Sequence, residues 1–233
     1  MKKINLEEAE SLAYDFRNKL GLSPTEPVQL KKILLKLNIL TRYRSLSERY
    51  CGLSIKAKNG RCFMLINSNI PRGRQHHTIA HELYHLFYDT EPKPHFNSND
   101  ANARPVEEVN ADMFASALLM PRLGISDILR RLESNELTLE KVIRMEQYFG
   151  VSHKSMLVRL DKLKRITTVQ YNQWNNIGIK ETAQAYGYPM SLYENGNNNL
   201  MIGDYKALTQ RLFEECKISE GYYNESLNLL EDE

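Results

Sequence analysis

Several features that would narrow the function are scarce or missing in this 233-residue sequence. It has three cysteines, Cys51, Cys62 and Cys216, an odd number that provides no disulfide framework, and it has no CxxC pair of the kind that binds metals. No apolar run is long enough to span a membrane, and the N-terminal residues become acidic at Glu7 and Glu8, where a signal peptide would be apolar. These absences predict a reduced, cytoplasmic protein that does not enter a membrane.

The sequence also lacks an excess of charge of one sign. Its 31 Lys and Arg residues nearly balance its 29 Asp and Glu residues, which gives a formal net charge of +2. This balance provides no electrostatic footprint for strong nonspecific binding to nucleic acids. The sequence contains no phosphate-binding glycine loop, internal repeat or nucleophilic triad, and its length fits one large or two small domains.

The segment Ile79–His85 contains an HExxH motif within a helical pattern. At 100° per residue its aliphatic residues form one stripe, and His81 and His85 fall on roughly the opposite side. Two imidazoles four residues apart on one helical face reach a single metal ion, which places Glu82 beside the water that such a site activates. The motif therefore predicts the arrangement of a zinc peptidase, with two nitrogen ligands and a carboxylate that accepts a proton.

A second helical pattern, Val106–Ala115, begins directly after Pro105 and provides two carboxylates on one face. Glu108 can complete the metal site, and Asp112, one turn later, can accept the free N–H of a ligating imidazole. The alternative is a solvated acidic helix face. Apolar residues on both sides of the carboxylates indicate a mostly buried helix, and buried carboxylates need partners, so we favour the metal site.

Helical geometry argues against a rival ligand set of His77 with His81 and His85. Eight residues of helix rise roughly 12 Å, too far for the first and last imidazoles to bind one metal. We therefore expect His77 to be packed or solvated, with a role near the cleft as the alternative.

The connection between the two helices, Asp89–Arg104, is polar, rich in Pro and Asn, and longer than most connections, which favours a mobile flap. The sequence does not single out the group that stabilises the transition state. The candidates are His95, Tyr50, Tyr84 and His153.

Together the two helices resemble the ImmA/IrrE family of metallopeptidases. The matching residues are Thr78-Ile79-Ala80-His81-Glu82-Leu83-Tyr84-His85, then Glu108, Ala111, Asp112, Phe114, Ala115 and Leu118-Leu119-Met120-Pro121. The resemblance implies a thermolysin-like site in which His81, His85 and Glu108 bind zinc, Glu82 is the general base and Asp112 supports a ligand.

The resemblance is strong over residues 72–121 and loose elsewhere. Two positions depart from the family pattern, since Tyr84 stands where Gly is usual and His77 where Phe is common. Members of the family cut helix-turn-helix repressors encoded nearby, in mobile elements or stress responses, which implies a substrate of that kind.

Three runs before the HExxH segment have the pattern of strands, namely Ile39–Tyr43, Tyr50–Ala57 and Arg61–Asn67. Asn59-Gly60 predicts a tight hairpin between the last two runs. A small sheet before the active helix is the layout of zincin-like metallopeptidases, in which an edge strand can bind an extended substrate. The sequence does not show which strand forms that edge.

We therefore expect an α+β chain in three parts. Residues 1–123 would form a zincin-like metallopeptidase domain, residues 124–165 an all-helical region with a helix-turn-helix-like hairpin, and residues 166–233 a mostly helical extension. The polar stretch 194–199 within the extension has the character of an exposed turn.

The segment Tyr148–Leu160 carries the main rival interpretation, because a helix, a Gly-Val-Ser turn and a second helix resemble a DNA-binding helix-turn-helix. A recognition helix needs base-reading side chains on its exposed face, and His153, Lys154 and Arg159 are a thin supply. The alternatives are a hairpin that supports the catalytic helices and a docking surface for the repressor.

The sequence thus predicts a zinc-dependent endopeptidase that binds one Zn²⁺ per chain, or another divalent metal, and cleaves a helix-turn-helix repressor. The alternative is a metal-containing transcriptional regulator or repressor-binding protein without peptidase activity. The number of protein ligands separates the two, because a catalytic site keeps one coordination position open.

Overall fold

The fold was analysed in a computed structural model that describes residues 2–47, 49–89, 104–131 and 137–231. It contains a four-stranded sheet in the order β2-β3-β1-β4. The strands are β1 (Ile39–Arg44), β2 (Gly52–Lys56), β3 (Cys62–Asn67) and β4 (Met201–Ile202). β1 pairs with β3 in parallel, whereas β2–β3 and β1–β4 are antiparallel. The mixed α+β class is confirmed, and β4 is a strand that the sequence pattern did not reveal.

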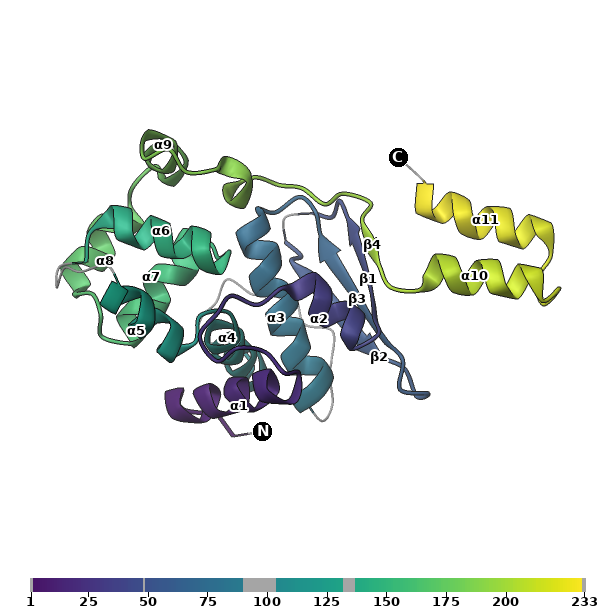
Figure 1. Ribbon diagram of the computed structural model, residues 1–233, viewed down its shortest axis with the longest axis horizontal. Helices are drawn as coiled ribbons and strands as arrows, with labels where there is room; N and C mark the ends of the chain where they lie inside the picture. The colour runs from purple at the N-terminus through teal and green to yellow at the C-terminus, as the bar shows by residue number, and fades with distance from the viewer. Residues whose placement is uncertain (1, 48, 90–103, 132–136, 232–233) are drawn as a thin grey trace.

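Most of the helices lie on one side of this sheet, and those from α5 to α9 lie farther from it (Figure 1). They are α1 (Leu6–Lys19), α2 (Leu30–Lys36), α3 (Arg72–Tyr88), α4 (Val106–Leu119), α5 (Arg122–Arg131), α6 (Leu139–Phe149), α7 (His153–Lys162), α8 (Thr168–Asn175), α9 (Ile179–Ala185), a 3₁₀ turn (Met190–Tyr193), α10 (Tyr205–Glu214) and α11 (Glu220–Glu231). α3 lies between the sheet and α4, and the α10–α11 hairpin lies beyond β4. Within the described ranges, no helix combines the length and the apolar character that crossing a membrane requires.

α1 shows how local sequence sets a helix and its buried face. Asn5 caps its first turn, and the Glu8 side chain accepts a hydrogen bond from the Asn5 backbone, which completes a capping box. A cap of this kind contributes about 1 kcal/mol. Ala9, Ala13 and Phe16 recur at helical spacing and are buried, and α1 packs on α4. The edge of Phe16 meets Phe114 of α4 at a centroid distance of 5.6 Å.

Within the described part of the chain, helices cover one face of the sheet. In β1 burial alternates with a period of two, so that Ile39, Thr41 and Tyr43 face the core. On the opposite face of β2, Leu53 and Ile55 are 37% and 55% exposed. Because α3 packs against β2 and β3, the covered face is the one beside the HExxH segment.

Two buried arginines fix the C-terminal end of α4, where helical carbonyls lack intrahelical partners. Arg17 of α1 donates to the Leu118 carbonyl from Nε at 3.0 Å, and Arg159 of α7 donates to the Met120 carbonyl at 2.9 Å. Burial lowers the pKa of Arg17 to about 10, still high enough to keep it charged at neutral pH. Cations at this end also interact favourably with the helix dipole, so α4 is held from two sides.

The extension beyond residue 165 adds contacts to the predicted peptidase domain. The main hydrophobic core contains residues from all three predicted parts, for example Ala13, Met156 and Ile202. Asn197 donates to the Gln75 side chain of α3 at 2.8 Å and is half-buried, whereas Glu194, Asn195 and Asn198 of the expected exposed turn are exposed. The boundaries at residues 123 and 165 stay a prediction.

Candidate metal centre

α3 places two imidazoles on the side of the helix that faces α4. His81 and His85 are one turn apart, and their Nε2 atoms lie 3.1 Å from each other. The helix is buried on most sides, with Ile79, Ala80 and Leu83 in the core, so its position is fixed by packing. The two ring nitrogens therefore point at one place without a flexible arm between them.

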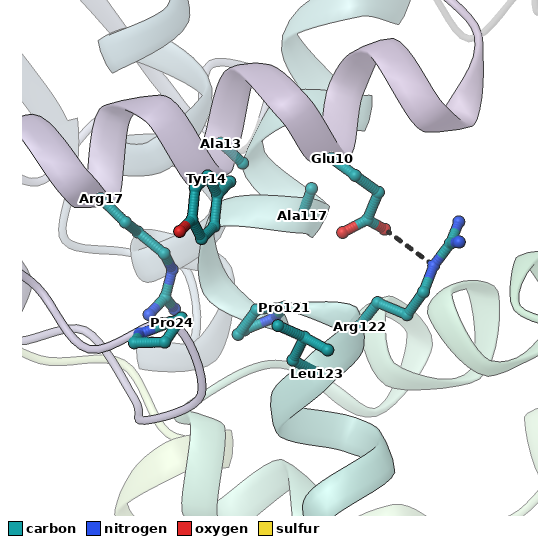
Figure 2. Close-up of a pocket in the computed structure, with 9 residues that line it drawn as sticks. All are labelled: Glu10, Ala13, Tyr14, Arg17, Pro24, Ala117, Pro121, Arg122 and Leu123. Carbon is teal, nitrogen blue, oxygen red and sulfur yellow. Dashed lines mark ion pairs between the residues drawn. The ribbon is translucent and has the colours of Figure 1, made fainter.

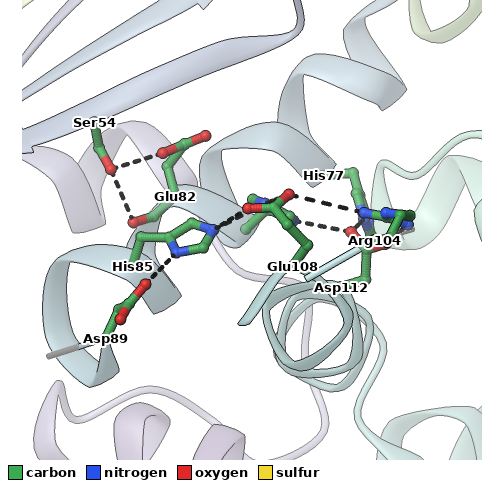
Figure 3. Close-up of polar contacts among 9 residues, drawn as sticks. Ser54, His77, Glu82, His85, Asp89, Arg104, Glu108 and Asp112 are labelled. Atoms are coloured by element: carbon green, nitrogen blue, oxygen red, sulfur yellow. Dashed lines mark hydrogen bonds and ion pairs between the residues drawn. The ribbon is translucent and has the colours of Figure 1, made fainter. Parts of the chain in front are cut away.

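α4 brings a carboxylate to the same point. One Glu108 oxygen lies 3.3 Å from His81 Nε2, and the other lies 3.1 Å from His85 Nε2. Ala111 and Ala115 of α4 are fully buried, and their small side chains allow close approach to α3. His81, His85 and Glu108, hereafter the three-ligand cluster, thus come from the two helices that the sequence predicted. Figure 3 shows His85 and Glu108 pointing toward one another.

Further carboxylates hold the other nitrogen of each ring. His81 Nδ1 lies 2.8 Å from Asp112 Oδ1, and His85 Nδ1 lies 3.1 Å from Asp89 Oδ2. In a neutral imidazole, an Nδ1–H that donates to a carboxylate leaves a lone pair on Nε2. Two imidazole lone pairs and a carboxylate then converge, and three such acceptors need a cation between them.

The ionisation of these groups reflects the same convergence. Burial alone would lower the pKa of His81, but hydrogen bonds to Asp112 and Glu108 raise it to about 10. Burial would also lower the pKa of His85, but its hydrogen bond to Glu108 raises that pKa. The pKa of Glu108 lies well below its usual range, because its hydrogen bonds to both histidines outweigh its burial. The cluster therefore attracts positive charge strongly.

The spacing between the two Nε2 atoms and the Glu108 carboxylate, which has one oxygen near each nitrogen, fits a metal ion. Tetrahedral zinc with bonds of about 2.0–2.1 Å holds neighbouring ligand atoms about 3.3 Å apart. The separations of 3.1 to 3.3 Å between these nitrogens and oxygens agree with that value. Two imidazoles and a carboxylate are also the donor set of thermolysin-type catalytic zinc.

A second, overlapping group joins His77, His81 and Asp112. It uses Nδ1 of His81, the nitrogen that donates to Asp112, and Arg104 lies 2.8 Å from the other Asp112 oxygen. His77 Nε2 is 3.4 Å from Asp112 Oδ1. Since Arg104 already supplies a positive charge here, the three-ligand cluster is the better candidate for a metal site, and His77 contacts the carboxylate that holds His81.

Glu82 lies next to the cluster on α3 and is only 8% exposed. Its carboxylate accepts a hydrogen bond from Ser54 Oγ of β2 at 2.6 Å. Figure 3 shows Ser54 and Glu82 on the sheet side of the site, and Arg104 and Asp112 on the opposite side. The general-base candidate is therefore oriented by a strand residue.

The structure separates the candidates for transition-state stabilisation. Tyr84 is 2% exposed and packs against Tyr88 and Phe114, and His153 is buried in a hydrogen-bonded pair, so neither lies free in a cleft. Tyr50 is 42% exposed. His95 and the predicted flap between Asp89 and Arg104 lie outside the described residues.

The helix-turn-helix-like segment is packed inward at the positions that DNA reading would need. His153 and Arg159 of α7 are buried, which leaves Lys154 as the exposed one of the three basic residues considered. The turn between α6 and α7 lies against α3, since a Cβ at Gly73 would come within 2.7 Å of the Ser152 nitrogen. This packing favours a supporting hairpin.

A separate pocket of about 160 Å³ lies between α1 and the start of α5 (Figure 2). Its walls include Ala13, Tyr14 and Leu123, and the Glu10–Arg122 ion pair borders it. Arg17, at the other end of the pocket, donates hydrogen bonds to the backbone carbonyls of Leu118 and Glu26. This pocket contains none of the residues of the three-ligand cluster.

Comparison with protein families agrees with this geometry. Residues 35–161 match the model of the IrrE N-terminal-like domain, a peptidase family. The chain belongs to this family. Comparison with curated proteins gives no significant match. The IrrE-like match covers β1 to most of α7, which includes both helices of the three-ligand cluster, and it identifies the chain as a metallopeptidase.

Sequence reasoning missed three side chains of this IrrE-like site, namely Ser54, Asp89 and Arg104. Asp89 could have been found, because it follows His85 by four residues and so lies one helical turn further along. Arg104 precedes Glu108 by four residues but stands before α4, where helical spacing gives no guidance. Ser54 had no signal, since only the fold brings β2 beside α3.

Proposed function

We propose that the chain is a zinc-dependent endopeptidase with His81, His85 and Glu108 as metal ligands. The observation that carries this proposal is the convergence of two imidazole Nε2 atoms and the Glu108 carboxylate within 3.1 to 3.3 Å. Zinc suits two nitrogen ligands and one oxygen ligand, although other divalent metals compete for such a set. We expect one metal ion per chain.

A divalent metal in this position supplies Lewis-acid polarisation of a peptide carbonyl and lowers the pKa of water. Glu82 takes a proton from the attacking water as the C–O bond forms, and returns it to the amine as the C–N bond breaks. Asp112 and Asp89 fix the tautomers of His81 and His85, which keeps both Nε2 lone pairs directed at the metal.

The position of β2 supports a peptide substrate. It is an edge strand beside the helix that carries Glu82, and an extended chain can add to such an edge by backbone hydrogen bonds. The specific substrate we propose is a helix-turn-helix repressor encoded near the gene, in a mobile element or a stress response, acting in the cytoplasm. Membership in the IrrE-like family supports this substrate class.

The second candidate is a metal-containing regulator that binds DNA or a repressor without cutting. The resemblance of α6–α7 to a helix-turn-helix favours it. The burial of His153 and Arg159 weighs against DNA reading by α7, so the remaining form of this alternative is a protein-binding role.

Incubation of the purified protein with the neighbouring repressor separates the two. The wild-type protein should produce two fragments by mass spectrometry, and Glu82→Gln should lower the cleavage rate by about a thousandfold with its metal retained. Stoichiometric repressor binding without cleavage in the metal-loaded wild type would favour the regulator. Loss of metal in Glu82→Gln would instead assign Glu82 a structural role.

A further inference from the structure

Ser54 lies on the edge strand and faces the helix that carries Glu82. β2 ends the sheet on one side, and among the described residues no other strand pairs with its outer edge. The Ser54 hydroxyl lies 2.6 Å from Glu82 Oε2 and 3.4 Å from the Glu82 backbone carbonyl oxygen. Figure 3 shows both contacts. A strand side chain therefore reaches the carboxylate proposed as the general base.

The backbone N–H and C=O groups of Ser54 lie in the plane of the sheet and point away from β3. The β2–β3 ladder is bounded by hydrogen bonds from Asn67 N to the Cys51 carbonyl and from Ala57 N to the Arg61 carbonyl. In an antiparallel pair, hydrogen-bonded residues alternate along the strand, so the odd-numbered residues of β2 bond to β3. Ser54, with its even number, directs its N–H and C=O outward, where an added strand would pair.

Gly52 explains how the strand comes so close to α3. A Cβ at this position would lie 2.7 Å from both the Leu65 carbonyl oxygen and Thr78 Cγ2, distances that real Cβ atoms essentially never show. Only glycine leaves this room for the helix. Two residues later, the short Ser54 side chain can reach Glu82, which a wider separation between strand and helix would prevent.

We propose that Ser54 is a positioning residue for peptide hydrolysis, with its hydroxyl on the Glu82 carboxylate and its backbone at the pairing position for substrate. This inference rests on the proposed peptidase function and concerns the same site.

The physical reason is that a glutamate carboxylate rotates broadly about its last bond. A hydrogen bond at 2.6 Å fixes one oxygen of Glu82 and leaves the other free to meet the attacking water. Ser54 would also pair with the substrate backbone. One residue would therefore fix the position of the Glu82 carboxylate relative to the scissile carbonyl. A displacement of about 1 Å at such a site can cost about a hundredfold in rate.

The test uses the full-length, zinc-loaded protein with Ser54→Ala and Ser54→Thr, and the neighbouring repressor as substrate. We expect Ser54→Ala to lower kcat by about ten- to a hundredfold with KM changed by less than about threefold. Ser54→Thr keeps the hydroxyl and should recover kcat to within about threefold of the wild type. Zinc content and thermal stability should stay at wild-type values in both variants.

Ser45→Ala is the matched control. Ser45 is exposed and its hydroxyl bonds to Asn69, outside the site, so its removal should leave kcat unchanged. The proposal is overturned if Ser54→Ala retains wild-type kcat, or if Ser54→Thr is as slow as Ser54→Ala. In either case normal inactivation by Glu82→Gln would leave the proposed peptidase function intact.

Binding of acetohydroxamic acid gives a readout that needs no protein substrate. This compound would chelate zinc as its hydroxamate anion, and the proton lost from its N–OH group would pass to a correctly placed carboxylate. We expect Ser54→Ala to weaken its binding at least about threefold, and Ser54→Thr to restore it. Equal affinity in all variants would contradict the role of Ser54, even if the repressor proves not to be the substrate.

Discussion

The three-ligand cluster and the Glu146–His153 pair are both buried histidine–glutamate groups, but the ring nitrogens of their histidines have different partners. In the pair, His153 Nδ1 bonds to one Glu146 oxygen and Tyr193 donates to the other at 2.9 Å. His153 Nε2 lies 2.9 Å from the Trp174 carbonyl oxygen. Burial raises the pKa of Glu146, whereas the pKa of His153 is raised by its hydrogen bond to Glu146 against the effect of burial.

In the three-ligand cluster the partners are distributed otherwise. Asp112 and Asp89 hold the Nδ1 atoms of His81 and His85, and the two Nε2 atoms converge with Glu108. The pair satisfies its polar groups within the protein and ties α6 and α7 to the extension, whereas the cluster requires a cation. Residue type alone does not distinguish a metal site from a structural one; the nitrogen that is already bonded does.

The largest expected effect separates the two glutamates by metal binding. Glu108→Gln removes the charged ligand and should weaken zinc binding by more than about a hundredfold, beyond the loss that an outer carboxylate causes. Glu146→Gln should leave zinc affinity unchanged. Competition with a chromophoric chelator measures both, and equal losses in the two variants would erase the distinction.

The next effect is on stability, and here the Glu146–His153 pair should matter. Glu146→Ala leaves His153 and Tyr193 with unpaired polar atoms in a buried site, which should lower the free energy of unfolding by about 2–3 kcal/mol. Urea unfolding of the zinc-loaded protein measures it. A loss below about 0.5 kcal/mol, the range of ordinary surface substitutions, would show that the pair contributes little.

Asp112→Asn and Asp89→Asn sharpen the comparison at the carboxylates behind the ligands. Each should weaken zinc binding by about ten- to a hundredfold, because the ligating imidazole loses the charged acceptor that fixes its tautomer. Asp161→Asn, at an exposed position of α7, is the control and should bind zinc normally. Unchanged affinity in Asp89→Asn would restrict the supporting role to Asp112.

The smallest expected effect is the number of protons released when zinc binds. The pKa of His81, about 10 against an ordinary value of 6.5, means that the apo-protein holds a proton on this ring at pH 7.5. That proton stabilises the fold fully below pH 6.5, and its contribution is lost as the pH rises through about 10.

Zinc must displace this proton, so binding at pH 7.5 should release about one proton from the ring. Calorimetry in buffers of different ionisation enthalpy measures the release. A value near zero would mean that His81 is already neutral, contrary to the charge balance described for the cluster.

Local periodicity explains what could be predicted from the sequence. His81 with His85, and Glu108 with Asp112, are each one helical turn apart, so two helical patterns sufficed to predict which side chains would meet. The three strand-like runs likewise correspond to β1, β2 and β3.

The remaining features depend on contacts between distant parts of the chain. The parallel pairing of β1 with β3 and the two-residue β4 have no local signal. Ser54 reaches Glu82 only because β2 lies at the edge and Gly52 lets α3 approach. His153 stands in a turn-like sequence, and only the fold shows that it points into the core.

The most direct test of the account is the metal content of three purified proteins, namely the wild type, His81→Ala and His153→Gln, after zinc loading and dialysis. Circular dichroism should first show that each variant is folded. The account predicts one zinc per chain in the wild type and in His153→Gln, and none in His81→Ala. Retention of zinc by His81→Ala, or its absence from the wild type after careful loading, would contradict the metal centre on which the proposed function depends.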